Sequence, residues 1–512
     1  MNGQRRRAGA FVALALALPP CAAAQARGAR DPWREFDAYV AQAVRDWNTP
    51  GLAIAVVKDD SVVFARGYGV RALGTSDSVT THTLFANAST TKAFTSMVVA
   101  MLMDSGRLRW DQRVAELVPE LVMRDPYVTQ ELTLRDLLTH RVGFGDPGYL
   151  WYGSEYDYAE IARHLRLVPA QSSFRSRYAY NNVTYATAGV MASRAAGASW
   201  DDLVRTRILE PLGMTETVTQ ASGLSGRADV ALPHDLIDDT LRVIGNAGIG
   251  LVDPIAPAGS MYSSVLDMSK WIRFLLDSGR VGGRRLVSEP AFTEMFRPQT
   301  VIRPGDFYPT ARLTRPHFTA YGMGWFLEDY RGEGVAMHTG SIDGTVAIVG
   351  LIPDRRIGVV IFANRDHVEL RHALMYRVFD QFIGGARRDW SVEMRAMYDS
   401  LASAARAQRR RVEAARVPGT RPTLPLERYA GTYSDSLYGD LTIRMENGVL
   451  VAAVSPFLTA DLEHWNYDTF RFRWRNRWIS PDLATFRIGP DGQVADVVVD
   501  GAARRRVDRR GP

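Results

Sequence analysis

The periodicity of apolar residues changes along the chain and separates helical from extended segments. Residues 31–48 and 268–281 repeat apolar side chains every three or four positions, which predicts amphipathic helices. Residues 51–69 and 335–366 contain short Val- and Ile-rich runs separated by turn residues, which predicts strands. The patterns from about Thr90 to Asn246 are mostly helical. Strands on both sides of this helical region predict an α+β fold, with an antiparallel sheet flanked by helices and a helical subdomain.

A different pattern follows a proline-rich linker at residues 417–425. The linker comes after a polar, Ala- and Arg-rich helical stretch at residues 388–416. Beyond it, Asn447-Gly448 and Asp491-Gly492 each stand between two alternating runs, which indicates tight β-hairpin turns. Residues 470–478 alternate aromatic and arginine side chains, which predicts a strand with one buried and one solvated face. The end of the chain is therefore expected to form a small all-β, barrel-like domain.

Residues 1–26 have the pattern of a signal peptide. The stretch "NGQRRR" is positively charged, "AFVALALAL" is apolar but too short to cross a bilayer, and "CAAAQA" supplies small residues for cleavage. Cleavage after Ala26 would remove Cys21, the only cysteine, and would exclude disulfides and thiolate chemistry in the mature protein. We expect an exported protein, periplasmic or extracellular, with no integral membrane segment after signal cleavage.

Length and charge set further bounds on the organisation. A chain of 512 residues is too long for one core, so we expect a main domain at 31–385, a helix and linker at 386–425, and a β domain at 426–505. Part of the net charge of +6 comes from arginines at the two ends. We therefore expect no nucleic-acid partner but a small-molecule or peptide substrate, while the oligomeric state stays open.

Ser89 and Lys92 form the first candidate for chemistry. The chain has 62 Lys and Arg, of which only Lys58, Lys92 and Lys270 are lysines, so 59 are arginines. On a helix, residues three apart share a face, and a lysine can lose its proton to become a base whereas an arginine cannot. With 28 serines and three lysines in 512 residues, chance alone gives about 0.16 such pairs, so the surrounding sequence has to decide.

The surrounding sequence is similar to one known superfamily. The stretch that begins "LFANASTTKAF" resembles the nucleophile helix of serine β-lactamases and penicillin-binding proteins, and "LLTHRVGF", "YNN", "PLGMTET", "PAGSMYSS" and "HTGSIDG" follow in the order of that superfamily. The branch it resembles contains class C β-lactamases, D-aminopeptidases, DD-carboxypeptidases and family VIII esterases. The segment "LERYAGTY" resembles the start of the lipocalin-like domain that some of these peptidases carry.

The resemblance implies a role for each matching residue. Ser89 would be the nucleophile, with Lys92 and Tyr180 taking its proton, and a phenol near Lys92 is expected to have a lowered pKa. Asn182 would bind Lys92 or the substrate amide, and the N–H groups of Ser89 and Ser341 would form the oxyanion hole. The remaining expected substrate-binding residues are His338 and Gly340, and His140 is expected to hold a loop. No cofactor or metal is implied.

One departure from the superfamily pattern shapes the expected substrate. β-Lactamases and transpeptidases generally have lysine where this chain has His338, whose charge is weaker and pH-dependent. We therefore expect hydrolysis of an amide, such as a peptide with D-residues, or of an ester. A β-lactamase or DD-carboxypeptidase is the first alternative, and a non-catalytic binding protein on the same fold is the second.

Two other enzyme classes fit the sequence poorly. The two histidines in "HVELRH" at residues 367–372 lie five apart, which matches no standard zinc spacing. No serine has the G-x-S-x-G flanks of an α/β-hydrolase.

Overall fold

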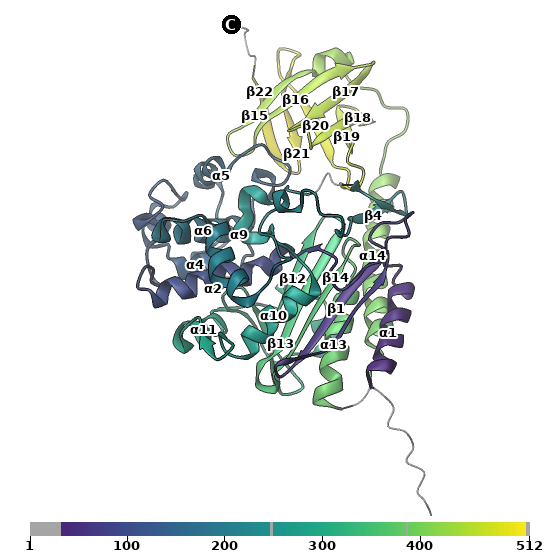
Figure 1. Ribbon diagram of the computed structural model, residues 1–512. Coiled ribbons are helices and arrows are strands. Elements are labelled where there is room, and N and C mark those ends of the chain that lie inside the picture. Colours follow the sequence, from purple (N-terminus) through teal and green to yellow (C-terminus); the bar gives the residue numbers. More distant parts are fainter. Residues whose placement is uncertain (1–31, 246–248, 386–387, 508–512) are drawn as a thin grey trace, which may run out of the picture.

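The computed structural model describes residues 32–245, 249–385 and 388–507, so the expected signal peptide lies outside the described residues. The described chain forms a large α+β unit, and a β barrel from the last part of the chain sits over one end of it (Figure 1). Both parts of the expected fold class are confirmed.

An eight-stranded antiparallel sheet is the centre of the main unit, in the order β2-β1-β14-β13-β12-β11-β10-β9. Its strands are β1 (Gly51–Lys58), β2 (Ser61–Gly69), β9 (Thr300–Val301), β10 (Thr319–Tyr321), β11 (Phe326–Tyr330), β12 (Glu333–Ile342), β13 (Thr345–Ile352) and β14 (Ile357–Ala363). β1 pairs with β14, and Leu52 lies opposite Ala363. The sheet is therefore assembled from distant segments, as the sequence predicts.

Alternating side chains on β1 point to two hydrophobic cores. Leu52, Ile54 and Val56 pack in one core with helices α1 (Pro32–Asp46) and α13 (Leu370–Ile383), and the intervening residues from Ala53 to Val57 face the other. That second core includes α2 (Thr91–Asp104) and α10 (Val265–Leu276). Both faces of the sheet are therefore covered, which explains why the buried strands are almost entirely apolar.

The helical subdomain and several short elements complete the main unit. The remaining helices before the barrel are α3 (Pro126–Glu131), α4 (Leu134–Leu138), α5 (Tyr158–His164), α6 (Asn182–Ala196), α7 (Trp200–Val204), α8 (Glu210–Leu212), α9 (Ala256–Gly259), α11 (Glu289–Met295), α12 (Ala311–Thr314) and α14 (Trp390–Ala414). Three short strand pairs join β3 (Phe85–Ala86) to β6 (Tyr262–Ser263), β4 (His234–Ile237) to β5 (Thr240–Val243), and β7 (Arg280–Val281) to β8 (Arg284–Arg285). Within the described ranges, no helix combines the length and the apolar character needed to span a bilayer.

The C-terminal strands close into an eight-stranded barrel. They are β15 (Gly431–Asp435), β16 (Gly439–Glu446), β17 (Val449–Ala453), β18 (Thr459–Asn466), β19 (Thr469–Trp474), β20 (Leu483–Ile488), β21 (Val494–Val499) and β22 (Ala502–Val507). Asn447 and Gly448 connect β16 to β17 with φ angles of 48° and 80°. Two consecutive positive φ values are those of a type I′ turn, which explains this residue pair.

The strand expected at residues 470–478 is shorter than its alternating pattern suggests. β19 ends at Trp474, and its outward arginines form ion pairs, as Arg471 does with Glu463 at 2.7 Å. The later residues leave the barrel wall and contact the main unit. The Trp478 indole donates to Asp343 at 2.9 Å, and Arg477 pairs with an aspartate of the β4–β5 turn. The alternating stretch therefore consists of strand β19 and a following loop that contacts the main unit.

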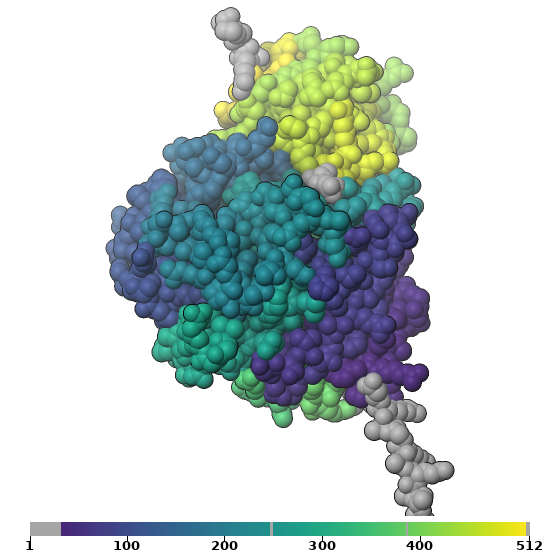
Figure 2. Space-filling model, in the orientation of Figure 1, coloured from purple at the N-terminus to yellow at the C-terminus, as the bar shows by residue number. Residues whose placement is uncertain are grey.

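The barrel is seated directly on the main unit (Figure 2). The Tyr152 hydroxyl donates to the same Asp343 carboxylate that accepts from Trp478. Ser455 donates to the Gly153 carbonyl, and a Cβ at Gly153 would lie 2.4 Å from the Phe457 ring. Backbone and ring approach each other so closely that only glycine fits there.

Candidate active site

Ser89 lies in a sharp connection between strand and helix. β3 ends at Ala86, a 3₁₀ turn covers Ala88–Thr90, and α2 begins at Thr91. Ala88 has a φ of 47°, a left-handed conformation that is unfavourable for a residue with a Cβ. The surrounding fold therefore holds a strained backbone at the residue that precedes Ser89.

Gly340 allows strand β12 to lie against this turn. A Cβ at Gly340 would be 2.3 Å from the Asn87 carbonyl oxygen and 3.0 Å from the Ser89 nitrogen. Any side chain would therefore push β12 away from the Ser89 backbone N–H. This gives a physical reason for glycine at the third position of "HTG".

Lys92 lies one helical turn after Ser89 and is fully buried. Its Nζ is 3.0 Å from Ser89 Oγ, 2.7 Å from Asn182 Oδ1 and 2.8 Å from the Ala258 carbonyl oxygen. Burial lowers the pKa of Lys92 to about 7, although the charge of Asp146 opposes the effect. A substantial fraction of Lys92 is therefore neutral near pH 7 and able to accept a proton.

Tyr180 contacts Ser89 from the other side. Its hydroxyl donates to Ser89 Oγ at 2.7 Å, and its ring lies 4.8 Å from Lys92 Nζ. Burial raises the pKa of Tyr180 well above its ordinary value, and the hydrogen bond to Ser89 only partly offsets this. The expected lowering of this pKa is therefore wrong, because desolvation of the phenolate outweighs any attraction to Lys92. Tyr180 is a neutral phenol beside the serine.

Asn182 is held in place by a residue that no motif indicates. Asp146 accepts hydrogen bonds from the Asn182 backbone nitrogen at 2.8 Å and from its Nδ2 at 3.0 Å. This orients the Asn182 carbonyl oxygen toward Lys92, so the expected contact between Asn182 and Lys92 is present. His140 accepts from the backbone of Asn181 at 3.1 Å and packs 4.4 Å from the Tyr180 ring. Asp146 is a loop residue whose role depends on tertiary structure alone.

His338 brings no positive charge to the site. It is 1% exposed, its Nε2 is 2.9 Å from the Tyr321 hydroxyl, and its Nδ1 is 2.6 Å from the Thr339 carbonyl oxygen. Burial and the nearby charge of Lys92 lower the pKa of His338 to about 3. The expected pH-dependent charge is therefore wrong for neutral solution, where this imidazole is uncharged.

Arg371 supports the strand segment that carries Ser341. The guanidinium donates to Ser341 Oγ at 3.0 Å and to the Ala347 carbonyl oxygen at 3.2 Å, and it pairs with Glu369 at 3.0 Å. Burial works against ionisation of Glu369, but the charge of Arg371 and the hydrogen bond with His372 outweigh it and lower the pKa of Glu369 to about 2. Glu369, Arg371 and His372 of the "HVELRH" segment thus form a buried ion network, and no group of three or more potential metal ligands occurs among the described residues.

A cavity of about 400 Å³ opens beside the serine. It is lined by Ser89, Tyr178, Tyr180, Asn182, Asp306, Phe307, Tyr308, Pro309, Phe326, His338, Thr339 and Ser341. All the expected site residues except the buried Lys92 and Gly340 therefore border one cavity. Much of its lining is aromatic, with Phe307 and Tyr308 contributed by the loop at residues 306–309.

Comparisons with known proteins relate this chain to a family. The profile of the β-lactamase family matches residues 36–381, and that of DUF3471, a domain of unknown function, matches residues 415–509. Unguisins hydrolase ungD of Aspergillus violaceofuscus is 30% identical, over 80% of this chain and 76% of its own length. Penicillin-binding protein 4 of Amycolatopsis lactamdurans is 26% identical, over 65% of this chain and 84% of its own.

A solved structure shows the same fold. The octameric penicillin-binding protein homologue from Pyrococcus abyssi superposes with a TM-score of 0.60 at 20% identity, over 92% of this chain and 99% of its own. The likeness extends across both the main unit and the barrel. The chain belongs to the β-lactamase family of serine hydrolases, which is related to penicillin-binding proteins.

Proposed function

We propose that this protein is an exported serine hydrolase that cleaves an amide or ester bond through an acyl-enzyme on Ser89. The observation that carries the proposal is the position of Lys92, fully buried and 3.0 Å from Ser89 Oγ. Burying a lysine destabilises the folded protein, because burial disfavours the charged form of its side chain. A lysine at a buried position therefore suggests a catalytic role. The lowered pKa is the property that a general base needs near neutral pH.

In the proposed acylation step, neutral Lys92 removes the proton of Ser89 as Oγ attacks the substrate carbonyl carbon. Negative charge then develops on the carbonyl oxygen, for which the N–H groups of Ser89 and Ser341 are the proposed donors. Tyr180, as a neutral phenol 2.7 Å from Oγ, protonates the leaving amine or alcohol and recovers a proton from Lys92. The products of this step are the acylated serine and the free leaving group.

Deacylation uses the same groups in the reverse order. Water takes the position of the leaving group, and Tyr180 and Lys92 remove its proton as its oxygen attacks the acyl carbon. The bond between that carbon and Ser89 Oγ then breaks, Lys92 returns the proton to Oγ, and the carboxylic acid product leaves. Asn182 and Asp146 contribute by positioning Lys92, since the chain Asp146–Asn182–Lys92 is continuous in hydrogen bonds of 2.7–3.0 Å. No step requires a metal or a cofactor.

The electrostatics of the cavity support an amide or ester substrate over a β-lactam. A neutral His338 offers no cation to a substrate carboxylate, and the charge of Arg371 is paired with Glu369. One relative is named as a hydrolase of unguisins, which supports hydrolysis but does not identify the bond that this chain cleaves. The alternative activity toward β-lactams or cell-wall peptides would need another anchor for the substrate carboxylate.

A substrate panel tests this proposal. We expect the chain to hydrolyse p-nitrophenyl esters or aminoacyl p-nitroanilides faster than nitrocefin, and the Ser89→Ala variant to lose every activity. Faster turnover of nitrocefin would instead support the β-lactamase alternative. Equal rates for wild type and Ser89→Ala on all substrates would exclude an acyl-enzyme on Ser89 and leave the binding-protein alternative.

Secretion of the full chain, compared with a chain that begins at residue 27, tests export.

A further inference from the structure

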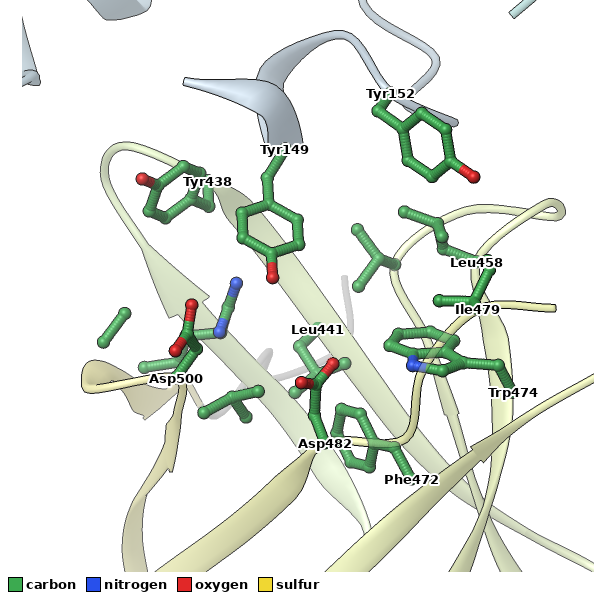
Figure 3. Close-up of a pocket in the computed structure, with 14 residues that line it drawn as sticks. Tyr149, Tyr152, Tyr438, Leu441, Leu458, Phe472, Trp474, Ile479, Asp482 and Asp500 are labelled. Carbon is green, nitrogen blue, oxygen red and sulfur yellow. The ribbon is translucent and has the colours of Figure 1, made fainter. Parts of the chain in front are cut away.

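The mouth of the barrel that faces the main unit encloses a second cavity, of about 160 Å³. It shares no lining residue with the cavity beside Ser89. Figure 3 shows Tyr149 of the main unit pointing its hydroxyl into this cavity, with Leu441, Phe472 and Trp474 of the barrel around it. Because Tyr149 and Tyr152 complete the lining, the cavity exists in this form only when the barrel is docked.

The inner part of the cavity is apolar. Leu441 and Phe472 are each 1% exposed, and Leu458, Val454 and Ile479 add further aliphatic surface. An engineered cavity of about 150 Å³ lined by such residues holds one benzene ring. The barrel cavity therefore has room for a single ring or a branched aliphatic group, and not for a long chain.

A buried cation without a partner faces the same space. Arg504 is 8% exposed and lines the cavity, yet among the described residues it forms no ion pair and no side-chain hydrogen bond. Its one ring contact is with Tyr438, at 5.9 Å. The negative charge of Asp435 favours the charged form of Arg504 without a direct contact. The Asp435 carboxylate instead accepts hydrogen bonds from the backbone N–H groups of Leu437 and Tyr438. Burying a guanidinium without an ion-pair partner is unfavourable, and its planar fork is suited to hold a carboxylate.

Two carboxylates also border the cavity. Asp482 and Asp500 both line it, and Figure 3 shows their side chains beside the Tyr149 hydroxyl. Burial raises the pKa of Asp482, the Trp474 indole opposes this, and the charge of Asp500 adds to it. A positively charged ligand group placed between these carboxylates would relieve their repulsion.

We propose that the barrel cavity binds a small zwitterion with one apolar or aromatic group, namely an apolar α-amino acid. Its carboxylate pairs with Arg504, its ammonium group with Asp482 and Asp500, and its side chain occupies the apolar interior. Each part of this ligand matches a separate part of the lining. This binding does not depend on the proposed hydrolysis at Ser89.

The test is calorimetric titration of the intact chain with three related probes. Phenylalanine carries both charges, phenylacetate only the carboxylate, and phenethylamine only the ammonium group. We expect phenylalanine to bind roughly tenfold or more tightly than either analogue, because each charged contact is desolvated in the cavity. The Ser89→Ala variant is expected to bind phenylalanine as wild type does. Equal affinity for the three probes, or no measurable binding of phenylalanine, would overturn the proposal.

Matched variants locate the bound probe. Arg504→Met is expected to weaken phenylalanine and phenylacetate roughly tenfold or more and to leave phenethylamine unchanged. Arg505→Met is the control, since Arg505 follows on the same strand but is exposed outside the barrel. Asp482→Asn is expected to weaken phenylalanine and phenethylamine only. Identical phenylalanine affinities for Arg504→Met and Arg505→Met would place the bound molecule elsewhere, including the cavity beside Ser89, and refute this site.

Discussion

Hydrolysis by this protein should depend on pH through the ionisation of one buried lysine. The pKa of Lys92 falls from 10.5 to about 7, mainly because burial disfavours the ammonium form. A shift of roughly 3.5 units corresponds to about 5 kcal/mol between the two protonation states. At pH 7 about half of the Lys92 side chains are then neutral, whereas at the ordinary pKa only about one in 3000 would be.

The direction of the effect follows from the role of Lys92. Only neutral Lys92 accepts the proton of Ser89, so kcat/KM should rise with pH, reach half of its plateau near pH 7, and stay level above about pH 8. Neither His338, with a pKa of about 3, nor Glu369, with a pKa of about 2, changes charge between pH 5 and pH 9. Glu328 does titrate, since burial raises its pKa to about 7, but its contact is with Tyr376 in the core.

The assay is the initial rate of p-nitrophenyl ester hydrolysis from pH 5 to pH 9 at low substrate concentration. Asp146→Asn should move the midpoint to lower pH, because the carboxylate that favours the charged lysine is removed. Glu328→Gln is the control and should leave the midpoint in place. A midpoint near pH 10 in wild type, or one that Glu328→Gln moves and Asp146→Asn does not, would refute Lys92 as the base.

Three further substitutions test the geometry around Ser89 and the barrel. Tyr180→Phe should lower kcat/KM by about 10²- to 10⁴-fold, measured with the same ester, while the melting temperature changes little because the ring stays in place. Gly340→Ala should lower the rate by about 10²-fold or more, since its Cβ would overlap the Asn87 carbonyl oxygen, whereas Gly334→Ala on the same strand, with open space around it, should be active. Trp478→Phe removes the hydrogen bond to Asp343 and should destabilise the docked barrel by about 1–2 kcal/mol, seen as faster proteolysis between the barrel and the main unit. Unchanged rates in Tyr180→Phe or Gly340→Ala, or unchanged proteolysis in Trp478→Phe, would contradict the corresponding contacts.

The site residues that could be identified from the sequence are those that belong to short sequence motifs. Ser89 and Lys92 are three residues apart on one helix, and Tyr180 and Asn182 belong to a short ordered motif. The structure brings these side chains together with His338. Turn chemistry likewise predicted the hairpin at Asn447-Gly448, because positive φ at two successive residues limits the choice of side chain.

Properties that depend on burial or on long-range contacts could not be predicted in the same way. Asp146 reaches the site from a loop outside the matched motifs, and Arg371 lies in the "HVELRH" stretch, which the sequence alone offered only as a poor zinc spacing. The pKa of Tyr180 and the charge of His338 depend on how completely the fold excludes water, which no spacing reveals. The end of β19 at Trp474 depends on the aspartates of the main unit that hold Arg477 and Trp478.

The most direct test of the proposed mechanism is covalent labelling of the active serine. After treatment with a fluorophosphonate, peptide mass spectrometry of the intact wild-type chain should find one adduct, on Ser89. The adduct should persist in Ser341→Ala, which changes another serine of the same cavity, and should be absent in Ser89→Ala. An adduct on any other residue of wild type, or labelling that survives in Ser89→Ala, would contradict an acyl-enzyme formed on Ser89.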